Sequence, residues 1–215
     1  MKIFINILFI NLLFIGSLNA SAINEVDSIY VNAMQKTLLQ LDSAKTENTI
    51  QHCKNQFERI SRVNSNQWMP MYYIAYCNVI SVYMNPKSPK SGLLLDEANA
   101  YINKLRTFKN ADQSEIETLN GFYCTALITL DPQINGQKYF GEVIASYTKA
   151  MKINPNNPRP ICLLVFFNSQ LPSFIQQKIE PKKEVEKAKS LFAQESPNIN
   201  SPYWGKEYLK VIVLE

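Results

Sequence analysis

Residues 143–158 read VIASYTKAMKINPNNP, an amphipathic stretch with two prolines, Pro155 and Pro158, near its end. Apolar, aromatic and small side chains recur in it at steps of three and four, the spacing of one helix face: Val143, Tyr147 and Ala150. The dipeptide Asn157-Pro158 places a capping residue before a proline at the first helical position. The stretch therefore predicts a helix, a short turn and the start of a second helix.

The same spacing recurs outward from this stretch in both directions. No segment shows sustained alternation of apolar and polar residues, so strands are not expected. The chain predicts an all-α protein of about nine helices, over residues 26–44, 50–60, 68–84, 94–105, 116–130, 140–151, 161–171, 185–193 and 203–214.

Three further signals mark where helices begin. Ser114 and Glu117 have the spacing of a capping box, in which each side chain bonds the backbone N–H of the other residue. Ser201-Pro202 has the same form as Asn157-Pro158 and predicts the start of the last helix. Pro70 fits only in a first turn, where its missing N–H has no intrahelical partner to lose.

The connections between the helices predict how the helices are arranged. Long loops with proline are expected at residues 85–91, 131–137 and 172–181, and short turns at residues 109–113, 154–157 and 196–201. Because long and short connections alternate, the helices are expected in pairs. Repeated two-helix units are typical of an α-solenoid of stacked antiparallel pairs. An irregular bundle of similar helices remains the alternative.

The first residues predict export. Lys2 precedes an apolar run over residues 3–16, and Ala20 and Ala22 form an Ala-x-Ala cleavage pattern, so residues 1–22 are expected to be a signal peptide. The run is shorter than the roughly 20 residues that a membrane-spanning helix needs. Residues 23–215 are then expected to form a single helical-repeat domain, periplasmic or secreted, with no membrane span after cleavage.

Composition excludes several classes of protein. The six glycines are scattered, so no Gly-rich phosphate loop is present. The net charge of +4 is small and unclustered, which argues against nucleic-acid binding. His52 is the only histidine, and no metal site or cofactor is expected.

The four cysteines have two interpretations. In an oxidising compartment they could pair, with three possible connectivities, or each could be a buried thiol on a helix face. None of their spacings is CxxC, so neither a redox motif nor a zinc knuckle is predicted. The residues are Cys53, Cys77, Cys124 and Cys162.

No motif predicts catalysis, and whether the protein is an enzyme stays open. His52 and Cys53 are adjacent, and on a helix neighbouring residues point about 100° apart, so they do not face each other. The acidic pair Asp96-Glu97 lies on the polar side of an amphipathic pattern, and the mixed charges of residues 180–189 indicate an exposed helix side.

The chain resembles the tetratricopeptide repeats, which are stacked helix hairpins. Val143, Tyr147, Ala150 and Pro155 are similar to the second helix of that repeat, Trp68, Tyr72 and Ala75 to the first helix, and Gly121 and Cys124 to its small-residue positions. The closing stretch SPNINSPYWGKEYLKVI, residues 196–212, also resembles exported repeat proteins of Bacteroidetes, whose function is largely unknown.

This resemblance implies a protein–protein interaction scaffold or adaptor in the cell envelope. The concave face of the stack would bind a protein or peptide, with Arg159 at its rim. The alternative is that the aromatic members of this face are ordinary core residues. The face would be lined by Tyr73, Tyr76, Phe122, Thr125, Phe166 and Ser169.

A second hypothesis is a small-ligand-binding protein or enzyme with a pocket under the long loops. Loops carry function when a rigid scaffold positions them. The polar candidates there are Asp131, Asn135 and Lys138.

Overall fold

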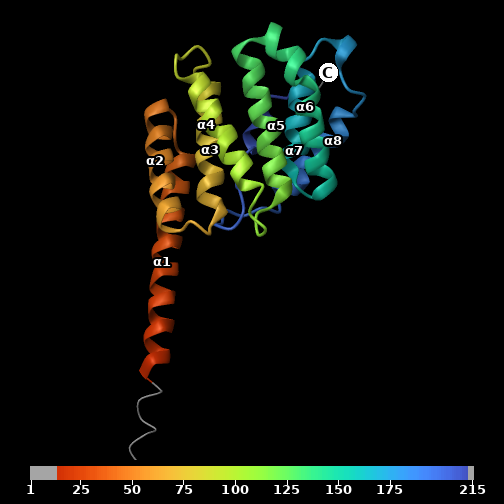
Figure 1. Cartoon of the computed structure of the whole chain (residues 1–215). Coiled ribbons are helices and arrows are strands. Elements are labelled where there is room, and N and C mark those ends of the chain that lie inside the picture. Colours follow the sequence, from red (N-terminus) through yellow and green to blue (C-terminus); the bar gives the residue numbers. More distant parts are fainter. Residues whose placement is uncertain (1–13, 213–215) are drawn as a thin grey trace, which may run out of the picture.

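The computed structural model describes the backbone of residues 14–212 and the side chains of residues 28–212, and within this part the fold is all-helical with no strand. Eight α-helices follow one another along the chain (Figure 1), and the connections between them have one to eleven residues. Their bounds are α1 Phe14–Asp42, α2 Glu47–Val63, α3 Trp68–Met84, α4 Ser91–Leu105, α5 Gln113–Leu130, α6 Pro132–Ile153, α7 Pro158–Ser169 and α8 Pro181–Phe192. Two short 3₁₀ helices, η1 Ser173–Ile175 and η2 Lys206–Lys210, complete the elements.

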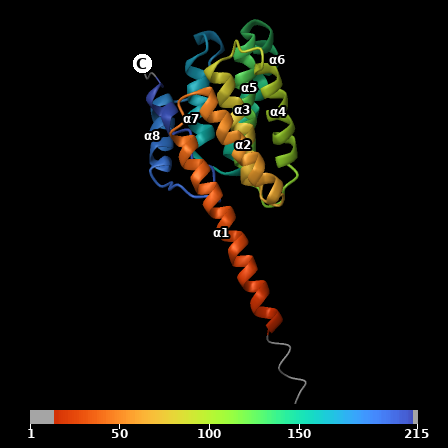
Figure 2. The ribbon, with the colours of Figure 1, turned by 90° about the vertical axis from the view of Figure 1, so that its left-hand side faces the viewer.

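Each helix packs against the next one in the chain. In addition α3 packs against α5, and α5 against α7, so these three helices form a row within the body. Figures 1 and 2 both show the N-terminal half of α1 extending away from the other helices. The expected signal peptide overlaps this half at residues 14–22, and residues 1–13 lie outside the described residues.

Two of the expected helix starts are confirmed. Pro70 lies in the first turn of α3, which begins at Trp68. Asn157 caps α7, because its side chain accepts a hydrogen bond of 3.0 Å from the Arg159 N–H while Pro158 occupies the first helical position. In both places proline stands where no backbone hydrogen bond is lost.

The predicted capping box at Ser114 is wrong. α5 begins at Gln113, two residues earlier than a Ser114 cap would place it, and Asp112 caps it by accepting a bond of 2.8 Å from the Ser114 N–H. The Ser114 hydroxyl instead donates to the carbonyl of Ala150 at 2.9 Å, and the Glu117 carboxylate pairs with Lys149 at 2.9 Å. Asp112 therefore satisfies the free N–H groups of the first turn, and Ser114 is left to join α5 to α6.

The predicted loop over residues 131–137 is also wrong. Asp131 alone separates α5 from α6, and its side chain caps α6 by accepting a bond of 3.1 Å from the Ile134 N–H. Pro132 occupies the first turn of α6. A capping Asp followed by Pro starts a helix as readily as it marks a turn, and here Asp131 and Pro132 start α6. The expected alternation of long and short connections is not observed.

The predicted ninth α-helix is absent from the described residues. After α8 the chain runs without an α-helix, and Ser201-Pro202 starts none. Asn198 forms a turn here, because its side-chain oxygen accepts bonds of 2.8 and 2.9 Å from the N–H groups of Asn200 and Ser201. We call residues 195–207 the C-terminal segment.

The core reaches from α1 to the C-terminal segment. Trp204 supplies the last large side chain, with its ring centroid 4.6 Å from that of Tyr76 on α3 and 5.1 Å from that of Phe122 on α5. All three residues are at least nine-tenths buried. Aromatic packing therefore fixes the C-terminal segment against the row of central helices.

Candidate functional site

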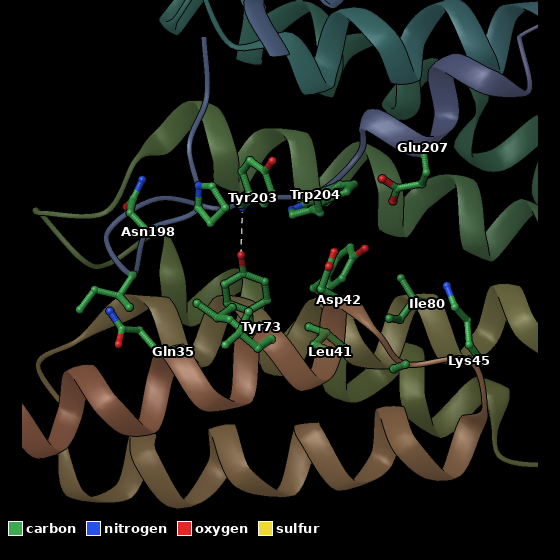
Figure 3. Close-up of a pocket in the computed structure, with 16 residues that line it drawn as sticks. Gln35, Leu41, Asp42, Lys45, Tyr73, Ile80, Asn198, Tyr203, Trp204 and Glu207 are labelled. Carbon is green, nitrogen blue, oxygen red and sulfur yellow. Dashed lines mark hydrogen bonds between the residues drawn. The ribbon is translucent and has the colours of Figure 1, made fainter. Parts of the chain in front are cut away.

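A cavity of about 680 Å³ lies between the C-terminal end of α1, one face of α3 and the C-terminal segment (Figure 3). The volume lies within the roughly 300–1,000 Å³ of pockets that hold small organic ligands. Sixteen residues line it: Gln35, Leu38, Leu39, Leu41, Asp42, Ala44, Lys45, Tyr73, Tyr76, Ile80, Pro197, Asn198, Ile199, Tyr203, Trp204 and Glu207.

Aromatic rings form the floor of the cavity. Tyr73 and Tyr76 are three residues apart on α3, and Ile80 is four residues further along the same face. The Tyr73 ring stacks on Phe57 of α2 at 5.1 Å, and the Tyr76 ring packs against Trp204. α3 is apolar nearly all round, so it is packed on several sides and still presents this aromatic face to the cavity.

The walls are apolar and the mouth is polar. Leu38, Leu41 and Ile199 are half-buried and line opposite sides, from α1 and from the C-terminal segment. Figure 3 shows the polar residues at the two ends of the cavity. Gln35 and Asn198 lie at one end and Lys45 and Glu207 at the other, with Asp42 between them.

Two hydrogen bonds tie the C-terminal segment to α3. The Tyr203 N–H donates to the Tyr73 hydroxyl at 3.0 Å, across the cavity (Figure 3). The Trp204 indole N–H donates to the Tyr72 hydroxyl at 2.9 Å. Since the segment has little regular structure, these side-chain contacts keep it in place as a wall of the cavity.

A buried arginine anchors the same segment from behind. Arg159 is 1% exposed, and its guanidinium contacts Glu195 through two hydrogen bonds of 2.8 and 2.9 Å. It also donates to the carbonyl of Pro202 and to the Glu115 carboxylate, the latter at 3.0 Å. A planar guanidinium with five N–H donors can hold several oxygens at once, which makes Arg159 the point where α5, α7 and the C-terminal segment meet.

Burial sets the ionisation of Glu115 and Tyr76. Loss of water around Glu115 raises its pKa to about 7, and the nearby Arg159 limits that rise. Burial raises the pKa of Tyr76 well above its usual value, with a further contribution from the nearby Tyr208 and Glu207. Tyr76 therefore keeps its proton across the physiological pH range and can act as a hydrogen-bond donor.

The structure separates the residues predicted for a partner-binding face. Tyr73 and Tyr76 line the cavity, whereas Phe122 lies beneath Trp204 and Arg159 is buried among carboxylates. Thr125 donates to the Gly121 carbonyl at 2.9 Å, Phe166 packs on Tyr208 at 5.4 Å, and the exposed Ser169 donates to the Phe166 carbonyl at 2.8 Å. These seven side chains do not share one exposed surface, and the packed-core alternative describes Tyr73, Tyr76 and Phe122.

The polar residues proposed under the loops have structural roles. Asp131 caps α6, the Asn135 amide donates to the Leu127 carbonyl at 2.7 Å, and the Lys138 ammonium lies 4.9 Å from the centre of the Tyr139 ring. None of them lines the cavity. A cavity does exist, but it lies under the C-terminal segment.

Sequence reasoning missed the residues of the C-terminal segment as site residues. The helix predicted over residues 203–214 gives no sign that Tyr203 and Trp204 line a cavity. The signal that identifies them is Gly205, the residue with positive φ in the described part of the chain, at +97°. Glycine adopts this backbone conformation without strain, so it marks a sharp bend directly after the tryptophan.

The described residues offer no metal or redox site. They include no group of three or more His, Cys, Asp or Glu side chains placed to hold a metal ion. The four cysteines are free, buried thiols, and burial raises the pKa of Cys124 and of Cys162 to about 12. Protonated thiols are poor nucleophiles, so they behave as small apolar core residues.

Among the helices that the structure describes, none is long and apolar enough to cross a bilayer.

Comparison with known proteins gives one informative likeness. No family model matches the chain, and no curated protein matches it. A similar solved structure is the HusA haemophore from Porphyromonas gingivalis, a species of the Bacteroidetes, with a TM-score of 0.74 and 28% sequence identity over 84% of this chain and 89% of that chain.

This likeness corrects the functional hypothesis drawn from the sequence. A haemophore carries a small ligand, so the likeness contradicts a tetratricopeptide-like scaffold for protein partners. It favours the alternative of a small-ligand-binding protein.

Proposed function

We propose that this protein is an exported carrier that binds haem, or a similarly large and planar apolar ring, in the cavity between α1, α3 and the C-terminal segment. The observation that carries the proposal is the cavity itself, with its aromatic floor, apolar walls and polar mouth. The likeness to a haemophore supports it.

The lining suits a flat ring more than a small polar molecule. Tyr76 and Trp204, 7% and 8% exposed, present part of their aromatic surface to a planar ring, and the leucines of α1 face them. Burial of apolar surface contributes roughly 25 cal/mol per Å², so a large ring gains most of its affinity from these walls. The charged substituents of such a ring would stay at the open mouth.

The lining offers little for ligation of iron. Among the described lining residues there is no His, Met or Cys side chain. Tyr203 is exposed at the mouth, and a phenol oxygen is a known haem ligand, so it is the candidate to test. The Tyr73 oxygen already accepts the Tyr203 N–H. Burial of the ring is therefore the main source of affinity in this proposal.

The fold and the expected signal peptide complete the proposal. Packing of each helix on the next, together with the row of α3, α5 and α7, supports a short superhelical stack of antiparallel helices. The stack holds the aromatic face of α3 rigid. The leader pattern in residues 1–22 supports export to the periplasm or the medium.

Titration with haem tests the proposal directly. Trp68 and Trp204 are the only tryptophans of the chain, so in Trp68→Phe the fluorescence reports on Trp204 alone. We expect saturable one-to-one quenching of Trp204, with a Kd in the micromolar range or tighter, alongside a shift of the haem absorption band. Absence of saturable binding up to about 100 μM, a weak affinity of roughly −5 kcal/mol, would contradict the function.

A matched pair of variants locates the ligand. Leu38 and Leu94 are both half-buried leucines, but only Leu38 lines the cavity. Leu38→Gln should weaken binding by about tenfold or more, because it removes apolar surface worth roughly 1.5–3 kcal/mol. Leu94→Gln should leave the affinity unchanged. Equal affinities of the two variants would place the ligand elsewhere.

A further inference from the structure

The hydroxyl of Tyr76 is a polar group without a partner in the cavity floor. Tyr76 is 7% exposed, yet its hydroxyl forms no hydrogen bond with any other described residue. Its ring is held by Trp204 at 4.6 Å, by Tyr73 at 6.1 Å and by Phe122 at 6.2 Å. The hydroxyl of Tyr73, its neighbour in the floor, already accepts the Tyr203 N–H. The buried polar side-chain atoms that lack a partner do not include the Tyr76 oxygen, so this hydroxyl keeps access to the space that Tyr76 lines, and a ligand in the cavity can accept its hydrogen bond.

Lys45 is a second unpaired group in the same cavity. It is the only cation among the lining residues that the structure describes, and it forms no ion pair with another described residue. Figure 3 shows it beside Ile80, which lies one helical turn beyond Tyr76 on α3. Glu207 lies at this end as well, and its carboxylate accepts the Gly205 N–H at 2.9 Å.

We propose that Tyr76 and Lys45 determine ligand specificity by holding a carboxylate of the bound ring at this end of the cavity. The Tyr76 hydroxyl donates a hydrogen bond to the carboxylate, and Lys45 supplies the opposite charge. This inference rests on the proposed function, because it assigns the orientation and substituents of the ligand in that same cavity.

The charges of the mouth make the pair selective. Asp42 and Glu207 also line the cavity and repel any anion that approaches it. A ligand carboxylate is therefore accepted only where a donor and a cation offset that repulsion. Gln35 and Asn198 at the other end are uncharged, so they cannot neutralise an anion there. A ring with carboxylates along one edge is consequently bound in one orientation.

The experiment compares haem with its dimethyl ester, which has the same ring but no carboxylates. Tyr76→Phe should weaken haem binding by about tenfold or more, as expected for the loss of a hydrogen bond to a charged group. Lys45→Gln should weaken it by roughly two- to fivefold, as expected for an exposed charge. For the ester, Lys45→Gln should have no effect, and Tyr76→Phe a smaller one than for haem.

Matched controls separate specificity from stability. Tyr101→Phe and Lys36→Gln make the same chemical changes at residues that do not line the cavity, and both should bind haem like the wild type. Tyr76→Phe breaks no hydrogen bond among the described residues, so it should unfold at the same denaturant concentration as the wild type. If Tyr76→Phe unfolds at a lower denaturant concentration, the affinities of Lys45→Gln for haem and for the ester test the inference in its place.

The outcomes are distinct. If the wild type binds haem and the ester equally well, and neither variant changes the haem affinity, the specificity inference is overturned while the carrier function stands. If the wild type binds neither ring, the proposed function itself fails.

Discussion

Glu115 is the residue whose ionisation is most closely linked to the position of the C-terminal segment. Its carboxylate accepts hydrogen bonds from Asn157 at 2.9 Å, Arg159 at 3.0 Å and Tyr72 at 3.2 Å. Two of these partners also bind the C-terminal segment. Arg159 pairs with Glu195, and the Tyr72 hydroxyl accepts a hydrogen bond from the Trp204 indole N–H. A single buried acid therefore connects α3, α5 and α7 to the wall of the cavity.

This linkage predicts a pH dependence of stability. The pKa of Glu115 rises from 4.5 to about 7 on folding, so between these values the folded protein keeps a proton that the unfolded chain has lost. The contribution of Glu115 to the free energy of unfolding is therefore largest below pH 4.5 and falls as the pH rises to 7. Urea unfolding of the wild type and of Glu115→Gln, from pH 4.5 to 8, measures it.

The glutamine variant cannot ionise and serves as the reference. The difference in unfolding free energy, wild type minus Glu115→Gln, should decrease through this window and level off above pH 7. A difference that increases over the same window would mean that Arg159 holds Glu115 ionised in the folded protein.

At the scale of the elements, the contact between α5 and α6 depends on Gly121. A Cβ atom at this position would lie 2.6 Å from the ring of Tyr147, which is 1% exposed and has no room to move away. The Asn120 amide next to it donates to the Ser146 hydroxyl at 2.8 Å, so the two helices are also joined by a polar contact. The close approach requires glycine.

Adding one carbon atom at Gly121 should therefore destabilise the helix stack. We expect Gly121→Ala to lower the free energy of unfolding by about 1–3 kcal/mol through overpacking. Gly136→Ala in α6 is the control, because no atom lies within 4 Å of the added carbon and alanine favours the helix by roughly 0.5–1 kcal/mol. Chemical denaturation measures both, and equal effects would show that Tyr147 moves aside.

The helices were the predictable part of this molecule. The bounds of α3 follow from its apolar residues and from Pro70, because both signals are local. The C-terminal segment was not predictable in the same way, since its apolar spacing is also that of a helix. Its path is decided by distant side chains, as when the Tyr203 N–H binds a tyrosine hydroxyl 130 residues away. Local periodicity cannot encode such a contact.

For the same reason only two site residues were found from the sequence. Tyr73 and Tyr76 stand out as aromatics on a helix face, although their assignment to a protein-binding groove stays without support. Leu38 and Leu41 look like ordinary core positions of an amphipathic helix. They become cavity residues only because no other helix covers that side of α1.

At the scale of the whole molecule, the cavity is lined by segments that lie far apart in the sequence. Its walls come from the end of α1 with the turn that follows it, residues 35–45, and from the C-terminal segment after residue 196, while α3 forms the floor between them. A ligand that packs against all three elements binds the folded state only, and it stabilises that state by about 2.7 kcal/mol at one hundred times its Kd. This stabilisation should be greatest in the elements that the bound ligand connects.

Hydrogen exchange can therefore locate the ligand without any substitution. With saturating haem, exchange should slow at residues 35–45 and 197–204, the two segments that contribute the walls of the cavity. The amides of α6, which line no part of the cavity, serve as the internal reference and should slow only as much as global unfolding does. Uniform slowing along the chain would indicate stabilisation without closure of this site, and protection confined to α4 or α6 would place the ring on another surface.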